Sequence, residues 1–278
     1  MRIKKCSLLL ILFTILNGCR GLGTNYSVST PLSNVTQIPN VSLTENSTIT
    51  PTLSPSDIQK ELEAFLQTNG NCLFPCFWGI RPELTSYTQV ESLFNSLGKQ
   101  GFVSNQGVHT LVSTTLAFKG GGRVYFKTDI QNNVVQNIEV TLDGLWNREI
   151  RPQDWSAYHL SEILRKYGHP TSIELYLDLP NNLILYGIKL TYNDLDTIVL
   201  YTASKSQDKI PSSHVSICPN GEIESVKINL GKSPINPEPS GVPLSNATGL
   251  TIDDFYGLFA GDTTSCLDIS LQAMGWQQ

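Results

Sequence analysis

Four cysteines in the body of the chain have a spacing that could do chemistry. They are Cys72, Cys76, Cys218 and Cys266. Four cysteines can form two disulfides in three ways, can work as a thiol–disulfide exchange pair, or can ligate zinc. The pairs Cys72–Cys76 and Cys218–Cys266 are favoured, because Pro75 disfavours a helical conformation at the residue before it and lets the short loop turn back on itself.

The two other interpretations of these cysteines fit less well. Thioredoxin-type redox pairs have two residues between their cysteines, whereas three separate Cys72 from Cys76, and the strand-to-helix context that lowers a thiol pKa is missing. Zinc knuckles need a different spacing, and no histidine stands near either residue. We therefore expect structural disulfides, no metal and no other cofactor.

The rest of the sequence contains no familiar catalytic motif. There is no nucleophile elbow, zinc-protease motif, phosphate loop or dinucleotide fingerprint. Turns, hairpin connections and helix caps are the simplest roles for the polar residues that could suggest a site. These residues are His109, His159, His169, His214, the glycine-rich run 119–123, Asp194, Asp196, Asp253 and Asp254.

Aromatic residues provide the one hint of a binding surface. Phe77 and Trp78 adjoin the first cysteine pair, and Trp146 and Trp155 flank the junction between two repeating units. Core packing is the default role of such residues, whereas exposure on a rigid scaffold would make them a binding patch. Phe77, Trp78, Trp146 and Trp155 are therefore the candidate binding patch.

Residues 1–18 have the pattern of a signal peptide. Arg2 and two lysines precede an apolar run at 8–16, which is too short for a membrane span of about 20 residues. The run ends in Leu16-Asn17-Gly18-Cys19, which resembles the lipobox of bacterial lipoproteins, with Asn17 where Ala, Ser or Thr is usual. The resemblance implies that Cys19 is diacylated, becomes the first mature residue and anchors the exported protein to the outer face of a bacterial membrane.

Residues 19–56 comprise this cysteine and a spacer dominated by Ser, Thr, Asn and Pro. The spacer has no period of 2 or 3.6 residues, so we expect no packed element there. A flexible chain of this length spans roughly 30–35 Å root-mean-square and would hold the body clear of the membrane. Its Asn-x-Ser/Thr sequons reflect composition rather than glycosylation.

Composition narrows the function classes. The chain is 40% hydrophobic, which is enough for a core, and only 15% charged, with a net charge of −5. Loss of residues 1–18 removes three positive charges and leaves −8. This acidic balance excludes a nucleic-acid binder, and the patterning excludes a coiled coil and a multi-span membrane protein. Lipid, rather than attraction to anionic headgroups, would hold the body at a membrane.

Periodicity predicts an α+β fold of two successive helix-plus-antiparallel-sheet units, 57–150 and 151–278, with a C-terminal strand and helix. In each unit a helix that ends at a glycine precedes three strands, and the pattern recurs after about 70 residues. The expected helices are 57–69, 85–97, 156–167 and 251–259, with further helical turns at 265–274. The expected strands are 110–119, 122–128, 134–142, 172–178, 183–192, 197–203 and 222–230, followed by a proline-rich loop at 231–248.

Residues 72–85 resemble a signature of uncharacterised exported bacterial lipoproteins, Cys-x-x-Pro-Cys-Trp-Trp-Gly-Ile-x-Pro-Gly-x-Thr. Phe77 stands in place of the first tryptophan and Glu83 in place of the second glycine. This resemblance implies no particular activity. The tandem order of helix, glycine stop and antiparallel strands is remotely similar to small lipoproteins of outer-membrane assembly and to the tandem-repeat β-lactamase inhibitor protein, and that similarity concerns the fold alone.

These observations predict a lipid-anchored, extracytoplasmic protein that acts as a binding or structural module at the cell surface. Its partners would be the membrane, through the N-terminal lipid, and a protein or other ligand of the cell envelope. The alternative is an enzyme, either a thiol–disulfide oxidoreductase that uses Cys72 and Cys76 or a hydrolase without a recognisable motif. An exposed cysteine of low pKa would favour the oxidoreductase, and a concave surface without a perturbed acid–base pair would favour binding.

Overall fold

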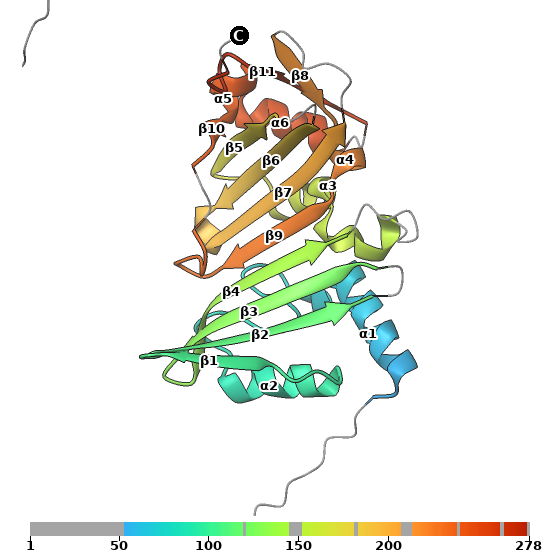
Figure 1. The fold of residues 1–278 in the computed structure, drawn as a ribbon, viewed down its shortest axis with the longest axis vertical. Helices are drawn as coiled ribbons and strands as arrows, with labels where there is room; N and C mark the ends of the chain where they lie inside the picture. The colour runs from blue at the N-terminus through green and yellow to red at the C-terminus, as the bar shows by residue number, and fades with distance from the viewer. Residues whose placement is uncertain are drawn as a thin grey trace, which may run out of the picture. The chain divides into compact units, whose positions relative to one another are not determined.

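Helices and antiparallel strands alternate along the chain, which confirms the predicted α+β class. The computed structural model (Figure 1) describes residues 53–118, 121–144, 152–180, 183–206, 213–237, 240–261 and 264–276. The helices are α1 (Pro55–Thr68), α2 (Tyr87–Ser96), α3 (Leu160–Tyr167), α4 (Pro219–Glu222), α5 (Leu244–Thr248) and α6 (Ile252–Phe259), with 3₁₀ segments η1 (Asn69–Asn71), η2 (Pro152–Tyr158) and η3 (Asn193–Leu195). None of these helices is long and apolar enough to cross a membrane.

Most strands of the described chain belong to one antiparallel sheet, in the order β1-β2-β3-β4-β9-β7-β6-β5-β10. Its strands are β1 (Phe102–Gln106), β2 (His109–Ala117), β3 (Arg123–Gln131), β4 (Val134–Asp143), β5 (Ser172–Asp178), β6 (Leu183–Tyr192), β7 (Thr197–Ser206), β9 (Ser225–Leu230) and β10 (Val242–Pro243). A separate two-stranded sheet pairs β8 (His214–Ile217) with β11 (Leu267–Ser270).

Strand β9 lies in the middle of the large sheet although it comes late in the chain (Figure 1). It pairs with β4 on one side and with β7 on the other, so that Ile228 stands between Val140 and Val199. The strands of the two units predicted from the sequence therefore form one continuous sheet.

One face of this sheet carries the hydrophobic core. Phe126, Val140 and Ile228 are cross-strand neighbours on that face, and all three are buried. Buried residues of α1, α2, α3 and α6 belong to the same core, because each helix turns its apolar side toward the sheet. The core is thus a single layer between these helices and the sheet.

The opposite face of the sheet, which we call the outer face, carries the residues that alternate with the core positions. Residues 231–237 lie against part of it. The Ser233 N–H donates to Asn137 Oδ1 at 3.1 Å, and Asn236 Nδ2 donates to the Glu139 carboxylate at 2.8 Å. The part of the chain that directly follows β9 is therefore attached to the outer face.

Local chemistry sets the helix ends. The Ser54 hydroxyl accepts from the Asp57 N–H at the start of α1, and the helix ends where Asn69 adopts a left-handed backbone with φ 54°. Helix α2 begins with a capping box, in which Ser86 and Gln89 each bond the other's backbone N–H. These caps place α1 and α2 near the ranges that the sequence predicts.

Differences from the expected elements arise where distant pairing decides the structure. The expectation of helical turns at 265–274 is wrong for 267–270, which form β11 and pair with β8 some 50 residues earlier in the chain, whereas 271–275 do form turns. The expected loop 231–248 contains the short elements β10 and α5. Strand β1 is an addition to the expected set, and it forms one edge of the sheet.

Candidate functional site

The cysteines form the two disulfides that the sequence favours, Cys72–Cys76 and Cys218–Cys266. Cys218 directly follows β8 and Cys266 directly precedes β11, so the second bond fastens the small sheet beside its Ile217–Leu267 pair. Two disulfides are compatible with an extracytoplasmic protein, since such bonds persist in oxidising compartments.

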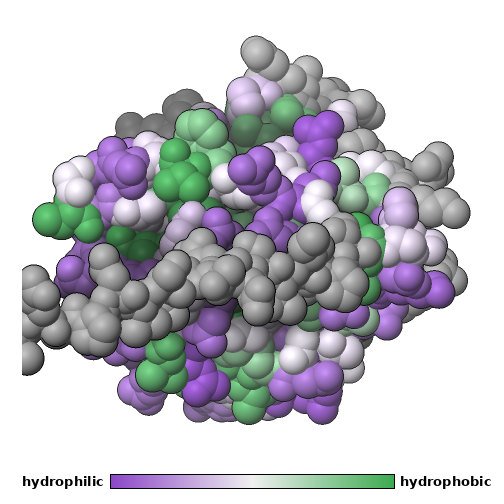
Figure 2. Space-filling view, turned by 90° about the horizontal axis from the view of Figure 1, so that it is seen from below, coloured by the Kyte–Doolittle hydropathy of each residue, from purple (hydrophilic) through white to green (hydrophobic). Residues whose placement is uncertain are grey.

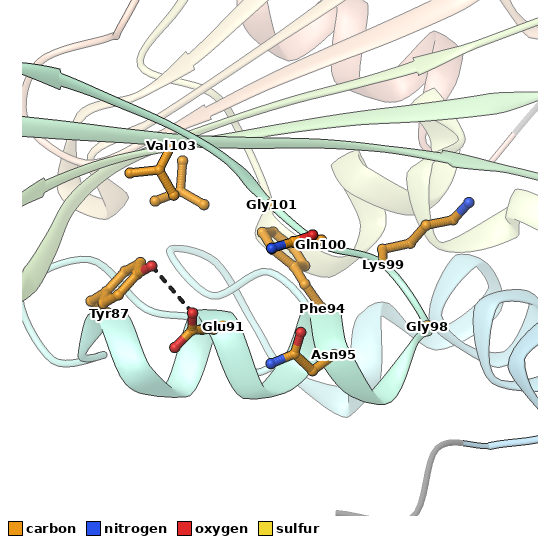
Figure 3. Close-up of a pocket in the computed structure, with 10 residues that line it drawn as sticks. Tyr87, Glu91, Phe94, Asn95, Gly98, Lys99, Gln100, Gly101 and Val103 are labelled. Atoms are coloured by element: carbon orange, nitrogen blue, oxygen red, sulfur yellow. Dashed lines mark hydrogen bonds between the residues drawn. The ribbon is translucent and has the colours of Figure 1, made fainter.

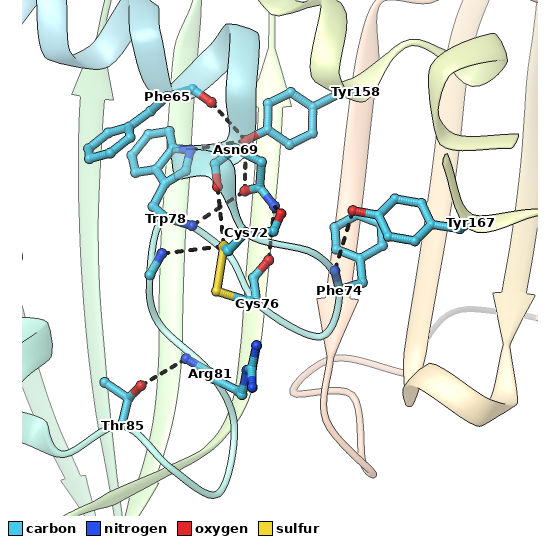
Figure 4. The surroundings of a disulfide bond; sticks show 11 residues. Phe65, Asn69, Cys72, Phe74, Cys76, Trp78, Arg81, Thr85, Tyr158 and Tyr167 are labelled. Atoms are coloured by element: carbon cyan, nitrogen blue, oxygen red, sulfur yellow. Dashed lines mark hydrogen bonds between the residues drawn. A yellow bond between two sulfur atoms is a disulfide. The ribbon is translucent and has the colours of Figure 1, made fainter. Parts of the chain in front are cut away.

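One buried side chain, Asn69, organises the loop of the first disulfide (Figure 4). Its Nδ2 donates to the carbonyls of Cys72 and Cys76 at 3.0 and 2.9 Å. Its Oδ1 accepts from the Trp78 N–H at 3.3 Å and from the Tyr158 hydroxyl at 3.1 Å. Every hydrogen-bonding position of the amide is thus used, and the loop is held rigidly by a group that offers no reactivity of its own.

Three members of the candidate aromatic patch are core residues. Phe77, Trp78 and Trp155 are only 0, 3 and 7% exposed, and the rings of Phe77 and Trp78 stack with centroids 4.9 Å apart. They stabilise the fold and present no exposed binding surface. Trp146 lies outside the described residues, as does Cys19.

The signature turn at Trp78-Gly79 explains this burial. Both residues have positive φ, 51° and 83°, as a type I′ turn requires. The Phe77 N–H donates to the Ile80 carbonyl at 2.8 Å, and the Ile80 N–H donates back at 2.9 Å. Gly79 supplies the left-handed backbone, and the turn directs Trp78 into the core.

Several of the polar residues that could suggest a site have structural roles instead. Asp254 and Thr251 form the capping box of α6, and hydrogen bonds from Thr251 lower the pKa of Asp254. His169 Nδ1 lies 2.8 Å from Asp253 Oδ1 at the exposed start of that helix. Asp194 and Asp196 belong to the turn between β6 and β7.

The remaining candidates are dispersed over the fold. His109, His159 and His214 lie in β2, at the start of α3 and in β8, and residues 121–123 belong to the connection between β2 and β3, with 119 and 120 outside the described residues. Among the described residues, no group of three or more His, Cys, Asp or Glu side chains could hold a metal ion.

A groove of about 590 Å³ separates α2 from the edge of the sheet (Figure 3). Tyr87, Glu91 and Phe94 on α2 form one wall, and Val103 and Val112 form the other. The loop between α2 and β1 closes one end of the groove. At the opposite end of β1 lies a further hollow of about 320 Å³, which shares Tyr87 and Val103 with the groove and continues it. The result is an elongated channel, open to solvent, beside a sheet edge.

Two details shape this groove. Gly101 lets the chain pass close to the sheet, because a Cβ there would lie 2.7 Å from Val112 Cγ1. The Tyr87 hydroxyl donates to Glu91 Oε1 at 3.3 Å, and burial together with the Glu91 charge raises the pKa of Tyr87. The Tyr87 phenol and the Glu91 carboxylate therefore stand together on the helical wall of the groove.

The rim of the groove exposes apolar side chains. Val103 and Val108 are 43 and 79% exposed. Figure 2 looks at the unit from the side of α2 and β1 and shows apolar groups scattered among hydrophilic ones. The opposite edge of the sheet is protected, since β10 has only two residues and one of them is Pro243.

A second hollow, of about 530 Å³, lies on the outer face. Gly187 forms its floor, because a Cβ there would lie 3.3 Å from both Tyr176 and Leu200. Beside it Lys189 Nζ and Glu174 Oε2 form an ion pair at 2.8 Å. Glu174 and Lys189 thus neutralise each other, whereas the two carboxylates that line the hollow itself accept hydrogen bonds from neutral groups, Asp178 from the Leu179 N–H and Glu224 from the Ser204 hydroxyl.

Comparison with known proteins gives no relative: the chain matches no protein-family model, no curated protein and no solved structure. The groove between α2 and β1 is the candidate site that sequence reasoning missed. Its only sequence signal is the uncharged run Phe102–Gln106 after a glycine, which is too short to stand out.

Proposed function

We propose that this chain is a lipid-anchored, extracytoplasmic binding module whose ligand site is the groove between α2 and β1. The observation that carries the proposal is the open channel beside an unprotected strand edge, which combines apolar residues such as Phe94 and the exposed Val103 with several polar ones. Clefts that combine apolar surface with polar groups able to orient a ligand are where proteins bind ligands.

A photo-reactive benzoylphenylalanine in place of Asn95, which lines the groove, tests this site. In intact producing cells we expect a crosslinked product from position 95. The matched control places the same group at Leu185, an exposed residue of the outer face. Crosslinks from position 185 alone, or from neither position, would show that the groove is not the binding site.

The anchor part of the proposal rests on the lipobox-like Leu16-Asn17-Gly18-Cys19 and on the two disulfides. Cys19→Ser should abolish labelling by an alkyne fatty acid and release the protein from the membrane fraction, because Cys19 carries the acyl chains. Equal labelling of the variant and the unchanged chain would contradict the anchor.

A thiol–disulfide oxidoreductase is the second candidate function. It is favoured by the Gly79 N–H, which donates to Cys72 Sγ at 3.5 Å and would stabilise a thiolate there. The burial of Cys76, which is only 4% exposed, argues against this function, because an exchange cysteine must be accessible to its substrate. If this function holds, mild reductant should open Cys72–Cys76 first, and Cys72 should react with iodoacetamide near neutral pH. Slow reduction of both disulfides would leave only their structural role.

A further inference from the structure

Strand β1 has a backbone edge that pairs with no other described strand. The turn between β1 and β2 contains two residues, so Gln106 and His109 are the hydrogen-bonded pair next to it, and bonded and non-bonded pairs alternate from there. Val103 and Asn105 therefore direct their N–H and C=O groups away from β2, at the edge of the sheet that borders the groove. These four groups are complementary to another extended backbone.

We propose that the groove binds an extended polypeptide segment, which adds to β1 as a further antiparallel strand. This inference rests on the proposed function and identifies the class of ligand. Strand addition derives its affinity from main-chain hydrogen bonds and its specificity from alternate side chains that enter pockets. Here the alternate side chains of the segment would enter between Val103 and Phe94 of α2, two apolar residues that line the groove.

Charges in the groove orient the segment. Glu91 lies on the helical wall opposite Val103, and Lys99 lies at the end where β1 begins (Figure 3). A segment antiparallel to β1 has its carboxyl-terminal side at the Lys99 end. The charges therefore favour a segment with a basic side chain next to Glu91 and a carboxylate next to Lys99. The net charge of −8 on residues 19–278 also favours a segment with a basic group.

A second copy of this chain fits the edge less well. In Figure 1, α2 runs alongside the open edge of β1. Two copies that paired their β1 strands would bring two α2 helices to the same side of the joined sheet, where they would compete for one groove. A segment without attached helices meets no such obstacle.

Selection of random twelve-residue peptides displayed on phage, with the purified full chain as target, tests the inference. We expect enrichment of peptides with alternating β-branched residues and a lysine or arginine. Val103→Pro removes an edge N–H that β2 does not use, and it should weaken binding of a synthesised selected peptide at least tenfold. Glu91→Gln should weaken it several-fold at low salt and less at high salt. Leu185→Ser, on the outer face, should leave it unchanged.

N-methylation of the peptide gives a readout that does not depend on how the variants fold. Methyl groups on the alternate amides that face β1 should abolish binding, and methyl groups on the intervening amides should leave it nearly intact. Equal effects of the two sets, absence of any selected peptide, or concentration-dependent dimerisation lost in Val103→Pro would overturn strand addition. If such a result coincides with crosslinking from position 95, the groove remains a binding site and only the class of ligand is wrong.

Discussion

Asn69 is the residue on which the first disulfide loop depends most. It is buried, and its amide joins the Cys72 and Cys76 carbonyls to Trp78 and Tyr158. Asn69→Ala should lower the free energy of unfolding by about 4 kcal/mol, since several buried polar groups would lose partners at about 1–3 kcal/mol each. Urea unfolding at neutral pH measures the loss.

Asn71 provides the matched control. It has the same left-handed backbone, φ 57° against 54°, but is exposed. Asn71→Ala should therefore cost only the conformational penalty of about 1 kcal/mol. Equal losses in the two variants would show that backbone strain, rather than the hydrogen bonds of Asn69, sets the stability of this loop.

The Glu174–Lys189 pair should make stability depend on pH. Burial raises the pKa of Glu174, but hydrogen bonds from Lys189 and the Gly241 N–H outweigh it and bring that pKa below its ordinary 4.5. A lowered carboxyl pKa stabilises the fold above pH 4.5, and the stabilisation is lost as pH falls below it.

Glu174→Gln should consequently destabilise the protein at neutral pH, and its deficit should shrink on acidification below pH 4.5. Thermal melts across this range measure the effect. Glu162→Gln, which breaks the exposed pair with Arg165, should change stability little at any pH. A deficit of Glu174→Gln that stays constant with pH would contradict the linkage.

At the scale of elements, the two disulfides should differ in how much they stabilise the fold. The chain-entropy relation gives about 4 kcal/mol for a bond that closes 48 residues, as Cys218–Cys266 does, and about 2 kcal/mol for the short Cys72–Cys76 loop. Replacing Cys218 and Cys266 by alanine should therefore lower the melting temperature more than replacing Cys72 and Cys76. Scanning calorimetry of the two double variants decides the order, and the reverse order would mean that loop packing outweighs chain entropy.

Sequence reasoning succeeds for elements with local signals. Helix α2 has its Ser86 cap and an apolar face, and β6 and β7 have long runs around a polar turn. It fails where the partner is remote in sequence. Strand β11 exists because β8 pairs with it, and the position of β9 depends on strands on both sides.

The candidate site is hard to predict for the same reason. The groove is a space between α2 and β1, and its walls come from residues that have ordinary roles when read singly. Phe77 and Trp78 are conspicuous in the sequence because they adjoin the first cysteine pair, yet the type I′ turn directs Trp78 inward. The open edge of the sheet becomes evident only from the strand order, in which β1 has β2 as its single neighbour.

At the scale of the whole described unit, the two halves should unfold together. Strand β9 pairs with β4 of the first predicted unit and with β7 of the second. Without β9, each of these two halves of the sheet would have unpaired backbone N–H and C=O groups at its edge. A buried link also joins them, because the Tyr201 hydroxyl donates to the Tyr158 carbonyl at 3.2 Å while the Tyr158 hydroxyl bonds Asn69. Calorimetry should therefore show one transition for the folded body.

Ile228→Ala tests this coupling directly. Ile228 is fully buried in β9 between Val140 and Val199. Its truncation should lower the free energy of unfolding by about 3 kcal/mol. In a cooperative unit, every amide that exchanges only through global unfolding shows this same loss. Hydrogen exchange should thus accelerate equally in β3 and β6, on opposite sides of the substituted strand. Val108→Ala, at an exposed turn, should change neither. Two calorimetric transitions, or faster exchange confined to one side, would show that the halves are separate folding units joined only by a strand pairing.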